Sequence, residues 1–178
     1  MNDKMVAKIY EMTLSTYFFA FYLRLMFFSD WQRIGRGGVR NQPKIESAFL
    51  DGSNRKKIIT ESISAPSGLA VDKVEQRLYW SDMILDKIES SDFDGTNRRV
   101  LFDHYGYSPF DPVETITGEM QQPYGLAVFR DKVFWTDWVT RAVYYADKRT
   151  GGKINLISSG FQRPMQIHVY SNVAKKGM

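Results

Sequence analysis

The chain has 178 residues, 43% hydrophobic and 15% aromatic, which predicts a folded domain with a sizeable core and excludes a disordered chain. It contains no cysteine, and this excludes disulfides, thiol catalysis and cysteine-ligated zinc. Of the formal net charge of +4, residues 1–43 carry +3 and residues 44–178 only +1, so the basic stripe typical of a nucleic-acid partner is lacking.

The N-terminal part contains an apolar run, Leu14–Phe28. The run includes Arg24 and is shorter than the roughly 20 apolar residues of a membrane-spanning helix, and no small-residue signal-peptide cleavage site follows it. We therefore leave residues 1–21 unassigned, with a signal anchor as the alternative. The end of the run is interpreted as a strand that recurs twice more.

That aromatic strand has three copies separated by 52 and 55 residues, and the excess over a constant unit lies in loops. A period of this size is typical of a repeat array. Each copy ends with aromatic residues, a hydroxyl residue and an aspartate. The residues are Phe28, Ser29 and Asp30 in the first copy, Tyr79, Trp80, Ser81 and Asp82 in the second, and Phe134, Trp135, Thr136 and Asp137 in the third.

Two further signals recur in register with the aromatic strand. A proline-led strand precedes it at 66–71 and 123–128 and, more diverged, at 164–169. An Asp-Gly pair, which favours a tight hairpin, follows it at Asp51-Gly52 and Asp94-Gly95. For the middle copy this order predicts four antiparallel strands near 67–72, 77–81, 86–92 and 97–102. Four short strands per copy are typical of a β-propeller blade.

The strand count predicts an incomplete ring. The first unit lacks the proline-led strand and the last contains little else, which gives three, four, four and one strands. A chain that starts on a second strand and ends on a first strand fits a ring closed by strands from both ends. The total is about three blades, fewer than the roughly four to eight that close a propeller.

These motifs resemble the YWTD (class B) repeats of the low-density lipoprotein receptor family, including receptors of the lipoprotein-receptor-related and vitellogenin-receptor type. The resemblance covers residues 22–172, leaves 173–178 as a tail, and implies an all-β fold, the C-terminal half of a six-bladed YWTD β-propeller. The first copy departs from the pattern, because Phe28 stands where the family has Trp. The resemblance also implies an extracellular module of a membrane receptor, found at the cell surface and in endosomes. That module has a protein ligand (a lipoprotein or secreted factor), a following EGF-like module, and no cofactor.

Strand geometry assigns structural roles to the motif. Neighbouring residues of a strand point to opposite faces, so Tyr79 and Trp80 are expected to contact the two neighbouring blades. Asp82 and its equivalents are expected to satisfy backbone N–H groups where the strands end. The alternative is that these aspartates ligate a metal or act as catalytic carboxylates; we expect no metal site.

Function is expected at the strand ends, on the face where the resemblance places protein ligands. Tyr, Trp, Arg and Met supply binding hot spots, although the two tryptophans could instead cover the blade ends as packing. The candidate ligand face comprises Trp31, Ala65, Ser67, Gln122, Tyr124, Trp138, Arg163 and Met165.

Two histidines, His104 and His168, are candidates for acid-triggered ligand release, with His168 preferred; the alternative is that they are a loop residue and a strand residue. Other functions stay open beside an endocytic receptor. They are a signalling co-receptor of the Wnt co-receptor type, a nidogen-like matrix protein and a calcium-dependent propeller hydrolase. A calcium-dependent hydrolase would need acidic residues on the inner strands. These strands carry mainly Leu, Ala and Val, and Asp72 is the main exception. We expect no enzyme.

Overall fold

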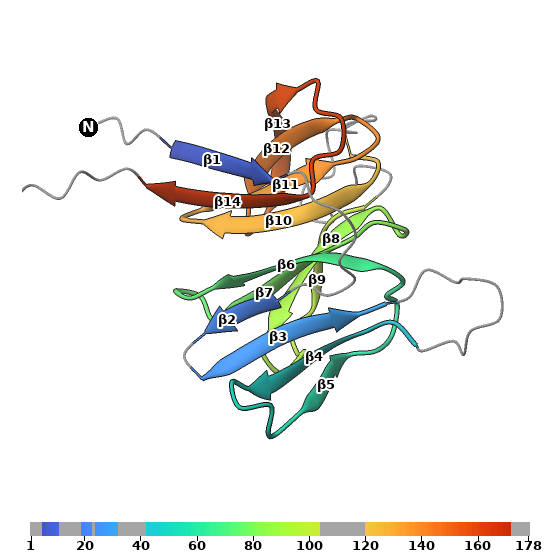
Figure 1. Cartoon of the computed structure of the whole chain (residues 1–178), viewed down its shortest axis with the longest axis vertical. Coiled ribbons are helices and arrows are strands. Elements are labelled where there is room, and N and C mark those ends of the chain that lie inside the picture. Colours follow the sequence, from blue (N-terminus) through green and yellow to red (C-terminus); the bar gives the residue numbers. More distant parts are fainter. Residues whose placement is uncertain (1–4, 11–18, 23, 32–41, 104–119, 172–178) are drawn as a thin grey trace, which may run out of the picture.

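The structure is a computed structural model that describes residues 5–10, 19–22, 24–31, 42–103 and 120–171. Within these ranges the chain consists of strands and turns, arranged as three four-stranded antiparallel sheets and one two-stranded sheet (Figure 1). The same ranges contain no helix long and apolar enough to cross a lipid bilayer. The predicted all-β propeller architecture is confirmed.

Each four-stranded sheet is formed by consecutive strands, and we call them blades 1 to 3 in chain order. Blade 1 comprises β2 (Phe19–Tyr22), β3 (Leu25–Asp30), β4 (Lys44–Phe49) and β5 (Lys56–Ile59). Blade 2 comprises β6 (Pro66–Asp72), β7 (Arg77–Asp82), β8 (Lys87–Asp92) and β9 (Arg99–Phe102). Blade 3 comprises β10 (Pro123–Phe129), β11 (Lys132–Asp137), β12 (Ala142–Asp147) and β13 (Gly151–Ser159).

The two ends of the chain meet in the remaining sheet, which we call the terminal sheet. In it β1 (Met5–Tyr10) pairs antiparallel with β14 (Gln166–Ser171), and β14 packs against β10 of blade 3 (Figure 1). Strands from both chain ends therefore share one sheet, but β14 pairs with β1 and not with the strands of blade 1, which the strand count had led us to expect.

Blade 1 differs from its predicted strand count. The sequence led us to expect three strands, but β2 pairs with β3 from Phe19 to Tyr22 and supplies the fourth. This strand has no Pro-x-Gly signal, and antiparallel pairing is made by backbone groups that do not require one. The first strand of blade 1 thus begins at Phe19. The predicted start of the repeat domain at residue 22 stays a prediction.

The Asp-Gly turns also differ from the expected tight hairpin. Between β8 and β9 the turn takes up residues 93–98, and only Gly95 of the pair has a positive φ, of 89°. The carboxylate of Asp94 accepts hydrogen bonds from the backbone N–H and the hydroxyl of Thr96 (2.9 and 2.6 Å). The pair therefore makes an Asx turn inside a longer connection, because the aspartate binds its own backbone two residues on.

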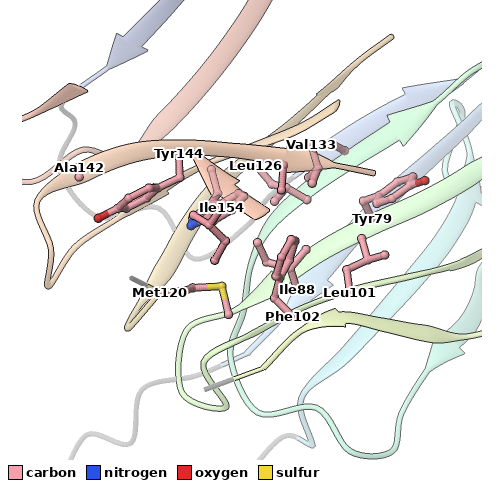
Figure 2. Close-up of a cluster of buried hydrophobic side chains, with 13 residues drawn as sticks. Tyr79, Ile88, Leu101, Phe102, Met120, Leu126, Val133, Ala142, Tyr144 and Ile154 are labelled. Carbon is pink, nitrogen blue, oxygen red and sulfur yellow. The ribbon is translucent and has the colours of Figure 1, made fainter. Parts of the chain in front are cut away.

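Adjacent blades pack face to face through the aromatic strands. Tyr79 lies in the hydrophobic cluster between blades 2 and 3, whereas Trp80, the next residue, lies in the cluster between blades 1 and 2. Both side chains are fully buried. Figure 2 shows Ile88 and Phe102 of blade 2 facing Leu126 and Ile154 of blade 3. The alternation of a strand thus lets one motif contact two neighbours.

The inner strands of successive blades approach at the glycines of the proline-led segments. A Cβ on Gly68 would lie 2.4 Å from the carbonyl oxygen of Tyr124, and one on Gly125 would lie 2.0 Å from that of Met165. No side chain fits there. The motif hydroxyls bridge the same contacts, since Ser81 Oγ donates to the Tyr124 carbonyl (2.7 Å) and Thr136 Oγ1 to the Met165 carbonyl (2.9 Å).

Candidate functional site

The candidate site is built at one end of the blades, which we call the motif end because β7 and β11 finish there with Asp82 and Asp137. Asp82 accepts four backbone hydrogen bonds of 2.6 to 3.1 Å, from residues 64 and 65 before β6 and residues 84 and 85 after β7. Asp137 accepts four equivalent bonds, from residues 121, 122, 139 and 140. Each buried carboxylate therefore fixes two loops of the motif end.

One of these loops presents an aromatic stack. Trp138 follows Asp137 directly, and its ring stacks on that of Tyr124 with centroids 4.1 Å apart and planes 13° apart. Its indole Nε1–H donates to the Pro164 carbonyl (3.0 Å), and its backbone N–H to that of Gln122 (3.1 Å). Burial raises the pKa of the Tyr124 hydroxyl.

Arg163 completes the stack from the solvent side. Its side chain is exposed, and its guanidinium carbon lies 5.5 Å from the centroid of the Trp138 ring, a cation–π geometry. Met165, mostly buried, belongs to the same hydrophobic cluster as Tyr124 and Trp138. Four of the predicted face residues, from β10, the loop after β11 and the segment leading to β14, are thus brought together.

Other predicted face residues are fully or partly buried. Ala65 and Ser67 are fully buried, and Ser67 Oγ donates to the Pro123 carbonyl of the next blade (3.1 Å). Their placement on a binding face is a wrong prediction, because a position at a strand end does not decide where the side chain points. Trp31 is only 8% exposed, and Gln122 is half-buried.

Comparison with known proteins agrees with this geometry. The family model for the low-density lipoprotein receptor repeat class B matches residues 24–73 and 76–111, which hold the first two aromatic strands. The chain carries low-density lipoprotein receptor class B repeats. The YWTD propeller is accordingly its fold, and Asp82, with its four backbone hydrogen bonds, lies within the second matched segment.

Two individual proteins extend the likeness beyond the matched repeats. The vitellogenin receptor Yl of Drosophila melanogaster is 33% identical over 146 residues, 82% of this chain and 6% of that receptor. A chain in a crystal structure of a nidogen/laminin complex superposes with a TM-score of 0.62 at 25% identity, covering 80% of this chain and 47% of that one. The class B segment therefore spans a small part of the receptor and about half of the other chain.

The opposite end of the class B blades carries an ion cluster. Asp72, at the end of β6, pairs with Lys148 from blade 3, and both side chains are buried. Lys148 also contacts Glu75 (3.2 Å), which pairs with Arg149. Burial raises the pKa of nearby Tyr79 to about 12. Asp72 is thus occupied by a lysine, and no group of three or more His, Asp or Glu that could hold a metal occurs among the described residues.

Apolar loop tips are the part of the motif end that sequence reasoning missed. Ile84 and Leu85 are 59% and 39% exposed in the loop after β7, and Val139 is 48% exposed in the loop after β11. Their signal was their position two or three residues past the motif aspartate. Of the two histidines, His168 is an exposed residue of β14, opposite Lys8 of β1, and His104 lies outside the described residues.

Proposed function

We propose that this class B segment is a protein-binding module of a low-density lipoprotein receptor-like endocytic receptor, acting on the extracellular face of the cell and in endosomes. The observation that carries the proposal is the stack of Arg163, Trp138 and Tyr124 at the motif end. The name of the vitellogenin receptor Yl supports a lipoprotein as the ligand class. The EGF-like module expected after the repeats is part of the same proposal.

The chemistry of the stack supports protein binding. Trp, Tyr and Arg are the residue types that dominate the energetics of protein interfaces, particularly where they are already held in place. Trp138 is held by Tyr124 beneath it and by the Pro164 carbonyl, so little side-chain freedom is lost when a partner covers it. The exposed Ile84 and Val139 enlarge the apolar area at the same end.

The test is the binding of purified vitellogenin and laminin to the immobilised chain, measured by surface plasmon resonance. For the ligand that binds, Trp138→Ala should weaken the affinity by about tenfold or more, because a hot-spot aromatic contributes about 2 kcal/mol or more. Val74→Glu is the matched control, since Val74 is 90% exposed at the opposite end and should not affect binding. Equal binding by Trp138→Ala and the wild type, with unfolding temperatures unchanged, contradicts the proposal.

The same assay separates the competing roles. Binding of vitellogenin supports an endocytic receptor, and binding of laminin alone favours a nidogen-like matrix role, for which the nidogen/laminin structural likeness is the supporting observation. A signalling co-receptor would bind a secreted factor in place of both. We propose a non-catalytic module in each case, in keeping with a family model that describes receptor repeats.

Acid release through His168 is the regulatory part of the proposal. His168 is exposed on β14, the strand that follows the Arg163–Pro164 segment of the site. If protonation of this imidazole drives release, the His168→Ala variant should keep its ligand at about pH 5.5, where the wild type loses it. Identical release by both proteins removes His168 from the mechanism.

A further inference from the structure

Four arginines of the described residues pair with a carboxylate, whereas Arg163 has no such partner among those residues. Arg77, Arg98 and Arg149 each form an ion pair with Asp92, Glu89 and Glu75, respectively, and Arg55 does so with Glu46. In two of these pairs the guanidinium also lies over an aromatic ring of the repeat, Arg98 over Trp80 and Arg55 over Phe28. The repeat thus combines an aromatic ring, a guanidinium and a carboxylate within one blade.

At the motif end an aromatic ring and a guanidinium meet in the same way, but without a carboxylate from the described residues. The guanidinium of Arg163 lies over Trp138, and no ion pair or hydrogen bond joins it to a carboxylate among the described residues. The motif carboxylate next to Trp138 in the chain, that of Asp137, is fully buried and already accepts four backbone hydrogen bonds. The planar fork of donors on Arg163 is therefore open to solvent and oriented by the ring beneath it.

We propose that Arg163 is a specificity-determining residue that binds a carboxylate of the ligand, an aspartate or glutamate side chain flanked by apolar residues. The inference rests on the proposed function and names the chemistry of the partner. An arginine fork matches a carboxylate with two parallel hydrogen bonds, and its pre-orientation on Trp138 lowers the entropy lost on binding. The apolar flank follows from Val139, 48% exposed in the same loop as Trp138.

The rigidity of the support distinguishes this arginine from an ordinary surface cation. Trp138 is fixed through its ring, its indole nitrogen and its backbone nitrogen, and the next residue but one, Thr140, donates to Asp137. Arg163 immediately precedes Pro164, whose carbonyl receives the indole hydrogen bond. The cation and its aromatic support are therefore held to each other through adjacent residues, as a preorganised binding group requires.

The probes are two capped peptides that differ in one group, Gly-Val-Asp-Val-Gly and Gly-Val-Asn-Val-Gly. Binding is followed by NMR through the indole N–H signal of Trp138. The wild-type chain should bind the aspartate peptide about tenfold more tightly than the asparagine peptide at low salt, with the preference shrinking as salt is raised. Arg163→Gln should abolish the preference, and Arg163→Lys, which keeps the charge and loses the fork, should retain part of it.

Arg130→Gln is the matched control. Arg130 also lies over an aromatic ring, that of Phe129 at 5.3 Å, but at the opposite end, and Gln76 shows that glutamine accepts a positive φ in the corresponding turn of blade 2. This variant should keep the full preference. Equal affinity of the wild type for both peptides, or an unchanged preference in Arg163→Gln, overturns the inference. The vitellogenin and laminin measurements decide the proposed function separately, since a protein ligand can bind the stack without using a carboxylate.

Discussion

At the scale of single residues, the motif aspartate joins two loops that the sequence places about 20 residues apart. Asp82 Oδ1 accepts from Ala65, Ile84 and Leu85, and Oδ2 accepts from Ser64 at 2.6 Å. The side chain is fully buried, so bulk water cannot replace its oxygens as acceptors for these backbone N–H groups. The carboxylate thus defines the shape of the motif end while leaving no oxygen for a metal or a substrate.

Replacement of this carboxylate should be costly in a graded way. Asp82→Ala leaves four backbone N–H groups without their acceptor, and we expect a loss of about 3 to 5 kcal/mol in the free energy of unfolding. Asp82→Asn keeps the oxygen that receives three of the four bonds and should lose only about 1 to 2 kcal/mol. Urea unfolding measures both, and equal losses for the two variants would show that the hydrogen bonds are not the cause.

At the scale of elements, blades 2 and 3 are joined at opposite ends by different chemistry. Near the motif end, Ser81 of β7 donates to the Tyr124 carbonyl of β10, while at the other end the Asp72–Lys148 pair links β6 to the turn after β12. Burial of Asp72 opposes its ionisation, but hydrogen bonds from Lys148, Glu75 and Val74 outweigh it and hold the carboxyl pKa below its ordinary value.

The stability of this junction should therefore depend on pH in a defined direction. Since the folded pKa of Asp72 is lowered, its contribution is fully present above the unfolded pKa of about 4 and is lost as pH falls through the folded value. Asp72→Asn should lower the unfolding temperature at pH 7, and its difference from the wild type should narrow below about pH 4. If the difference in unfolding temperature between Asp72→Asn and the wild type stays constant down to pH 3, the ion pair does not contribute to folding.

The strands also show how much of the fold and of the site could be predicted from the sequence. The strands of blade 2 begin and end within two residues of their predicted bounds, because proline, Asp-Gly and the motif aspartate mark their ends. β2 could not be predicted in the same way, since it has no such marker and is defined by its pairing with β3. The repeat predicted Tyr124, Trp138 and Arg163 at one end, and the structure shows their side chains stacked, but the repeat could not show that Ala65 and Ser67 are fully buried.

The glycines illustrate the same limit. Gly68 and Gly125 lie in a recurring segment, which indicates structural importance. Only the packed blades show the reason, a carbonyl of the next inner strand 2.4 and 2.0 Å from a hypothetical Cβ. Contacts between copies depend on how the copies are rotated relative to one another, and this rotation is not encoded in the spacing of one copy.

At the scale of the whole molecule, the three blades form a row in which the middle blade is covered on both faces. Trp80 of blade 2 is buried against blade 1, and Tyr79 against blade 3. Blade 3 meets blade 2 on one side and the terminal sheet on the other, where Phe134 packs with Ile167. Stability in such an array is expected to be a sum of blade terms and nearest-neighbour contacts.

Hydrogen exchange followed by mass spectrometry should show which strands of the three blades open first. We expect the amides of β6, β7 and β8 to exchange most slowly, because opening them breaks both blade contacts, whereas β5 and β13, the outer strands of blades 1 and 3, should exchange earlier. Trp80→Ala should accelerate exchange in blades 1 and 2 more than in blade 3, since its ring lies in the contact between the first two. Equal acceleration in all three blades would show that the row unfolds as a single cooperative unit instead of blade by blade.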